Sequence, residues 1–131
     1  MDWSPICKPR GSLRREPNLA DYVATCRQFT WDEARAQLDG LPGGGLNIAH
    51  EAVFRHLQGP RADQVAIRFL AQSQPDVTRT YRELATDARR FASVLCRLGV
   101  VRGDCVATLL GRVPTLYTTV LGALAAGAVY C

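Results

Sequence analysis

The segment 103–131 has the pattern of a β-α-β unit, and this pattern restricts the fold more than any other feature. Residues 105–110 form a continuous apolar run, typical of a strand that is covered on both faces. Pro114 begins an apolar helix that ends at Gly127, and a second apolar run follows up to Cys131. A crossover helix needs a sheet shared by both of its strands. We therefore expect an α/β protein of which this chain is the front part, with its second strand incomplete.

The clearest helix is predicted between Thr80 and Gly99. Thr80 and Glu83 have the spacing of a capping box, and Gly99 is a typical stop. Apolar residues recur at intervals of three and four along one face: Tyr81, Leu84, Ala88, Phe91, Leu95 and Leu98. The opposite face is charged and is interpreted as solvated. The apolar stripe is expected to pack on the sheet that contains residues 105–110 and to serve folding.

Shorter elements are predicted before this helix. Residues 1–18 are interpreted as an irregular leader because they are rich in proline and poor in apolar residues. Helices are expected at residues 21–29, from Thr30 to a stop at Gly40, and at residues 48–57 after an Asn47 cap. A hairpin is expected from strands 65–70 and 77–80, which are joined by the polar segment 72–76.

Few residues are candidates for chemistry. The glycine-rich loop 41–46 follows a helix and lacks the lysine of a phosphate-binding loop, so a linker is favoured over a phosphate site. His50 and His56 project from different faces of their helix and are interpreted as polar surface residues. The sequence shows no paired carboxylates, metal-ligand cluster or catalytic triad. No catalytic, cofactor-binding or metal-binding residue is therefore assigned.

Composition excludes several classes of partner. The net charge of +4 is not gathered into a basic stripe with aromatic residues, so no nucleic-acid partner is expected. Residues 113–131 are uncharged, but the predicted helix inside them is too short for a membrane span, and no membrane partner is expected. The five cysteines have no C-x-x-C spacing. Cys96 and Cys105 are interpreted as buried thiols without disulfides, in a cytoplasmic protein.

Several motifs together resemble the opening of the adenylate-forming superfamily. They are the segments 80–84 (TYREL), 95–100 (LCRLGV), 102–104 (RGD), 106–107 (VA) and 121–130 (LGALAAGAVY). A second block resembles the N-terminal cap of AMP-forming acetate–CoA ligases, also called acetyl-CoA synthetases. It comprises Trp31 and the segments 38–45, 47–49 and 51–56. The resemblance covers nearly everything except the leader.

This resemblance implies a domain plan of three parts. Residues 1–18 are the leader, residues 19–58 correspond to the acetyl-CoA synthetase-like cap, and residues 59–131 begin a truncated AMP-binding domain. The implied fold is an α/β N-terminal fragment of an adenylate-forming enzyme, with a helical cap, a β-hairpin and an incomplete β-α-β layer.

The resemblance also implies an activity for the parent protein. Acetate, ATP and CoA are its expected small-molecule substrates, and Mg²⁺ assists the phosphate chemistry through acetyl-AMP. The family's phosphate loop and catalytic lysine have no counterpart here, so the 131-residue chain is expected to be inactive and to bind no cofactor. A ligase for propionate or acetoacetate, another adenylation domain and a non-catalytic interaction or remnant domain remain alternatives.

Overall fold

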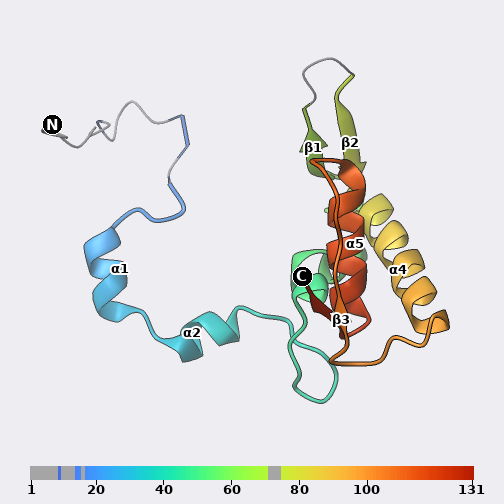
Figure 1. The fold of residues 1–131 in the computed structure, drawn as a ribbon. Coiled ribbons are helices and arrows are strands. Elements are labelled where there is room, and N and C mark those ends of the chain that lie inside the picture. Colours follow the sequence, from blue (N-terminus) through green and yellow to red (C-terminus); the bar gives the residue numbers. More distant parts are fainter. Residues whose placement is uncertain (1–8, 10–13, 16, 71–74) are drawn as a thin grey trace, which may run out of the picture. The chain divides into compact units, whose positions relative to one another are not determined.

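The computed structural model describes residues 9, 14–15, 17–70 and 75–131 (Figure 1). The chain divides into two units, residues 1–37 and residues 38–131. Most of the predicted leader 1–18 lies outside the described residues, as do Cys7 and residues 72–74 of the predicted hairpin connection.

The first unit contains two short helices, α1 (Tyr22–Gln28) and α2 (Trp31–Ala36). The Asp21 carboxylate accepts a hydrogen bond from the Ala24 N–H at 2.9 Å and caps α1. Thr30 caps α2 in the same way by accepting from the Glu33 N–H at 3.2 Å. Helix α2 ends earlier than predicted, before Gly40. Neither helix contains a buried residue, and helices this short are only marginally stable without packing.

The second unit begins with a helix that is interrupted where one continuous helix was predicted. Asn47 caps α3 (Ile48–Ala52), and a 3₁₀ helix, η2 (Phe54–Gln58), follows directly. Val53 separates them with φ −133° and ψ −55°, outside the helical region. Its side chain is buried in a cluster with Leu84 and Ala85 of α4. The break therefore coincides with the point where this segment joins the core.

The predicted hairpin is present as β1 (Val65–Phe69) and β2 (Val77–Thr80). The strands are antiparallel, with Phe69 opposite Val77 and Val65 opposite Thr80, and the register is irregular near Val65. The hairpin leads directly into α4, where the Arg82 guanidinium pairs with Asp63 at 2.7 Å.

Helix α4 (Tyr81–Arg97) carries both halves of the predicted capping box. The Thr80 hydroxyl accepts from the Glu83 N–H at 3.2 Å, and the Glu83 carboxylate accepts from the Thr80 N–H at 2.8 Å. Gly99 ends the helix with φ +85°, a conformation that suits glycine. The predicted stripe is wrong at its last member, since Leu98 is 75% exposed.

The β-α-β unit is present but its first strand is shorter than predicted. Strands β3 (Cys105–Val106) and β4 (Val129–Tyr130) pair in parallel, and α5 (Pro114–Ala125) connects them (Figure 1). Residues 107–110 are not strand, and Leu109 is fully exposed. Among the described strands, β4 is the one that pairs with β3. A strand needs hydrogen-bonded neighbours to extend, and this sheet provides a single short one.

The predicted burial of two cysteines is also wrong, because Cys96 and Cys105 are both exposed. Cys96 lies at an exposed position of α4, and Cys105 begins the two-residue strand β3. The apolar sequence around each cysteine suggested burial. A side chain is buried, however, only where another helix or strand packs over it.

Helix α4 packs mainly against α5 (Figure 1). Leu95 forms a cluster with Ala123 and Ala128, against which Val106 of β3 and Tyr130 of β4 also pack. The C-terminal part of the stripe therefore reaches the small sheet as expected, while the middle of the stripe faces α5. The prediction had not included this helix–helix contact.

Gly122 allows α4 and α5 to approach closely. A Cβ atom at this position would lie 2.8 Å from both the Ala88 carbonyl oxygen and Phe91 Cδ1. We therefore expect Gly122→Ala to separate the helices at a cost of about 1–3 kcal/mol. Hydrogen exchange of the α4 and α5 amides should become about tenfold faster or more.

Gly111→Ala is the matched control, because an added Cβ there meets no atom within 4 Å. It should leave exchange in both helices unchanged. Equal protection in the two variants would show that the close approach at Gly122 does not stabilise this pair.

Among the described residues, no helix is both long enough and apolar enough to cross a membrane.

Candidate functional site

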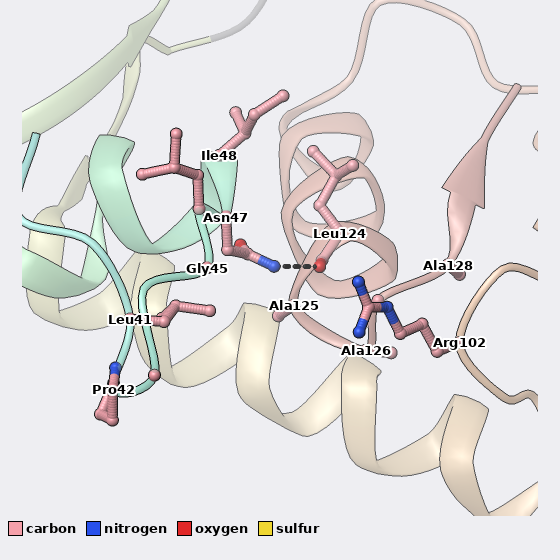
Figure 2. A pocket seen from close by; sticks show the side chains of 13 residues that line it. Leu41, Pro42, Gly45, Asn47, Ile48, Arg102, Leu124, Ala125, Ala126 and Ala128 are labelled. Atoms are coloured by element: carbon pink, nitrogen blue, oxygen red, sulfur yellow. Dashed lines mark hydrogen bonds between the residues drawn. The ribbon is translucent and has the colours of Figure 1, made fainter. Parts of the chain in front are cut away.

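A candidate site is a pocket of about 660 Å³ in the second unit. It lies between the loop that precedes α3 and the C-terminal end of α5 (Figure 2). Its walls are mostly apolar: Leu41, Pro42, Leu46, Ile48, Leu124 and residues 125–128. Arg102 contributes the single charged side chain of this lining.

Asn47 fixes the relative position of the two walls. Its side-chain amide donates to the Leu124 carbonyl oxygen at 2.7 Å (Figure 2). Its side-chain oxygen accepts from the N–H groups of Ala49 and His50. One side chain therefore caps α3 and also joins this helix to the last turn of α5. Asn47 therefore has a structural role in the pocket.

The glycine-rich loop beside the pocket is closed by its own backbone. Leu41 donates its N–H to the Gly45 carbonyl at 2.8 Å, and Gly44 donates to the Leu41 carbonyl at 2.9 Å. Gly43 and Gly44 adopt φ values of +89° and +84°, which favour glycine. A phosphate-binding loop directs its N–H groups at the ligand. Since two N–H groups of this loop bond within it, the geometry agrees with the predicted linker.

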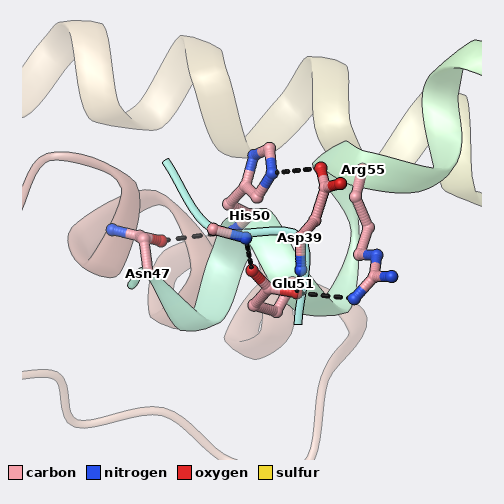
Figure 3. A network of polar contacts seen from close by, with 6 residues as sticks. Asp39, Asn47, His50, Glu51 and Arg55 are labelled. Carbon is pink, nitrogen blue, oxygen red and sulfur yellow. Dashed lines mark hydrogen bonds and ion pairs between the residues drawn. The ribbon is translucent and has the colours of Figure 1, made fainter. Parts of the chain in front are cut away.

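A polar network holds the start of this loop against α3 (Figure 3). The Glu51 carboxylate accepts from the N–H groups of Asp39 and Gly40 at 3.0 and 2.7 Å and pairs with Arg55 at 2.6 Å. Burial raises the pKa of Glu51, but these three donors outweigh it and leave the pKa below its ordinary value of 4.5. The ionised carboxylate therefore stabilises this part of the fold.

Glu51→Gln should loosen the segment before the loop, because a neutral amide cannot replace a carboxylate that accepts from three donors. We expect faster hydrogen exchange at the Asp39 and Gly40 amides. In the unaltered chain their protection should be present above pH 4.5 and be lost as the pH falls through the lowered pKa of Glu51.

The Gln variant should lack this pH dependence once intrinsic exchange rates are corrected. Asp87→Asn, which removes an exposed and weak pair with Arg90, is the control and should leave both amides unchanged. Identical pH profiles with and without Glu51 would contradict the role of the network.

The two histidines, interpreted from the sequence as polar surface residues, are partly exposed, and each also has a partner within the fold. His50 is half-buried and lies 3.0 Å from the Asp39 carboxylate. His56 is also half-buried, with its ring edge-to-face against Tyr81 at 5.1 Å. Burial lowers the pKa of His56, and the positive charges of Arg61 and Arg55 lower it further. Both histidines have structural partners, and sequence spacing alone did not identify either contact.

The described part of the chain offers no group of three or more His, Cys, Asp or Glu residues that could hold a metal ion. The pocket brings together one arginine and apolar side chains, and its lining contains neither a carboxylate nor a histidine. This arrangement can accept an apolar surface or a single anionic group. It does not provide the paired acid and base that proton transfer needs.

Comparison of the sequence with known proteins finds similar enzymes. The family model described as AMP-binding enzyme matches residues 53–131. An acetyl-coenzyme A synthetase from Bacillus subtilis is 34% identical over 119 residues, which cover 90% of this chain and 21% of that protein. One from Halorhodospira halophila is 37% identical over 114 residues, covering 86% of this chain and 17% of that protein.

Comparison of the structure with solved structures also finds an enzyme of this kind. The crystal structure of a Brucella canis acyl-CoA synthetase superposes with a TM-score of 0.74 at 34% identity. The match covers 83% of this chain and 20% of that one. The chain thus spans about a fifth of the length of the relatives that it matches.

Proposed function

Since this chain belongs to the AMP-binding enzyme family, we propose that it forms the N-terminal part of an AMP-forming acetate–CoA ligase. The parent enzyme joins acetate and ATP into acetyl-AMP with release of pyrophosphate, and the CoA thiol then displaces AMP. The supporting observation is the extent of the match to acetyl-coenzyme A synthetases. It covers 90% of this chain, so it includes much of the segment that precedes the family match at residue 53.

The proposed domain plan keeps residues 19–58 as the cap and residues 59–131 as the start of the AMP-binding domain. In the structure these parts are joined by packing within the second unit. Val53 and Phe54 of the cap lie against Leu84 and Ala85 of α4, and Asn47 bonds to the last turn of α5. The cap residues from Leu38 onward therefore buttress the first helices of the AMP-binding domain.

The role of this chain in catalysis is then to support a site formed elsewhere in the parent. ATP, CoA and Mg²⁺ would act with the parent enzyme, in which the metal assists phosphate chemistry. The described residues contain no group of three or more His, Cys, Asp or Glu side chains, and two N–H groups of the glycine-rich loop bond within that loop. No catalytic or binding residue is assigned to them. The proposed compartment is the cytoplasm, which supplies ATP and CoA and where disulfides are usually transient.

Two preparations test this function. The purified 131-residue chain should form no AMP or acetyl-CoA from acetate, ATP, CoA and Mg²⁺. A chimera that carries this chain in place of the aligned fifth of the Bacillus subtilis enzyme should be active with acetate. Activity of the isolated chain above background would contradict the proposal. So would a soluble, cooperatively melting chimera without acetate-dependent AMP formation.

A further inference from the structure

Two cysteines from distant parts of the sequence meet on the small parallel sheet. The Sγ atoms of Cys105 and Cys131 lie 3.2 Å apart, and both residues are exposed. Backbone bonds hold the two strands together beside them. Val129 donates its N–H to the Asp104 carbonyl at 2.8 Å, and Cys131 donates to the Val106 carbonyl at 3.0 Å. The fold therefore brings the thiols together and holds them in place.

The pair is close to the geometry of a disulfide. A disulfide joins sulfur atoms about 2.05 Å apart, so the two sulfurs need to approach by about 1 Å. Rotation of the two side chains about their χ1 angles can make such a movement. A metal site is a poorer explanation, because no third ligand of the His, Cys, Asp or Glu type joins them in the described structure.

We propose that Cys105 and Cys131 form a redox-sensitive dithiol that closes to a disulfide between β3 and β4. The oxidant is a small disulfide of the glutathione class. The thiolate of one cysteine attacks one of its sulfurs, which forms a mixed disulfide and releases one glutathione thiolate. The thiolate of the other cysteine then attacks the cysteine sulfur of this mixed disulfide and releases the second glutathione thiolate. The chain loses two protons and two electrons, and the glutathione disulfide gains the electrons.

The contact between the thiols also affects ionisation. A hydrogen bond with Cys131, the charge of Cys131 and a smaller effect of burial all raise the pKa of Cys105. Either sulfur can be the donor in this contact, so either thiol can react first. The resulting bond would link β3 directly to β4, the two strands that α5 connects.

Two other cysteines provide an internal comparison. Cys26 on α1 and Cys96 on α4 are also exposed, so they meet the same oxidant. If exposure alone decided the reaction, all of these thiols would react alike. A preference for the 105–131 linkage would reflect the position of the two strands.

The test treats the soluble, monodisperse chimera that carries this chain with oxidised glutathione, traps free thiols by alkylation and maps disulfides by mass spectrometry. Cleavage after Arg102 and Arg112 places the two cysteines on separate peptides. We expect the 105–131 linkage to form about tenfold faster or more than any linkage of Cys26 or Cys96. The preference should disappear in guanidinium. Cys105→Ser should leave Cys131 as a glutathione adduct, whereas Cys96→Ser should not affect the linkage.

Separate glutathione adducts on Cys105 and Cys131 in the native chain would overturn the proposal. The same conclusion would follow from a mixture of linkages that matches the one formed in guanidinium, or from disulfides mainly between chains.

Discussion

Phe91→Ala is expected to destabilise the second unit by about 2–4 kcal/mol. Phe91 packs against the cluster of Leu95, Ala123 and Ala128 and lies beside Gly122, where α4 and α5 approach most closely. Its side chain is half-buried, so the expected loss is at the lower end for a phenylalanine truncation. In the chimeric enzyme, the change should lower soluble yield and melting temperature.

Leu98→Ala is the control for this prediction. It also removes a large apolar side chain at the end of the same helix, but from a position that is 75% exposed. Its effect should stay within about 0.5 kcal/mol. Arg89→Ala is a poorer control, because the Arg89 guanidinium lies 4.9 Å from the centre of the Phe54 ring. It should therefore lose a cation–π contact of about 0.5–1 kcal/mol.

Phe91→Ala should leave the Michaelis constants for acetate and CoA near those of the unaltered chimera. The apolar face of α4 contacts other parts of this chain and has no polar group to orient a substrate. Unchanged stability together with an approximately tenfold rise in either Michaelis constant would instead make this face part of a binding site.

The isolated chain is expected to associate or to occupy an expanded, partly folded state. Its buried apolar core consists mainly of alanines, and among the described residues no large side chain is fully buried. Many large apolar residues are exposed instead, including Ile48, Leu70, Leu98, Val101 and Leu109. The two-stranded sheet of β3 and β4 also has open edges, which favour pairing between chains.

Sedimentation velocity checks this expectation. Leu109→Lys should reduce association, since it places a charge beside the sheet edge where Leu109 is fully exposed. Leu70→Lys, at an exposed position after β1, is the matched control and should have a smaller effect. A monodisperse monomer with a sharp cooperative melt would show that the core is sufficient by itself.

Local sequence patterns predicted much of the secondary structure. The Thr80–Glu83 capping box, the Asn47 cap and the Pro114 start of α5 all depend on groups a few residues apart, and all three occur in the structure. Both strands of the hairpin were predicted for the same reason. The resemblance to adenylate-forming enzymes was equally readable, because it depended on the order of short motifs along the chain.

Features that depend on distant neighbours were predicted less well. The apolar run 105–110 forms a strand over only two residues, because β4 is its single partner among the described strands. The same pattern suggested that Cys105 is buried, although it is exposed. The contact of Glu51 with Asp39 and Gly40, the pocket beside Arg102 and the Cys105–Cys131 pair join segments with no shared local pattern. Sequence reasoning therefore missed all three.

The most direct test of the central proposal is the steady-state kinetics of the chimeric enzyme. If this chain supports the active site without contributing residues to it, the Michaelis constants for acetate, ATP and CoA should remain within about threefold of the Bacillus subtilis enzyme. A folded, monodisperse chimera in which any of these constants changes about tenfold or more would contradict the account, because side chains of this chain would then take part in substrate binding.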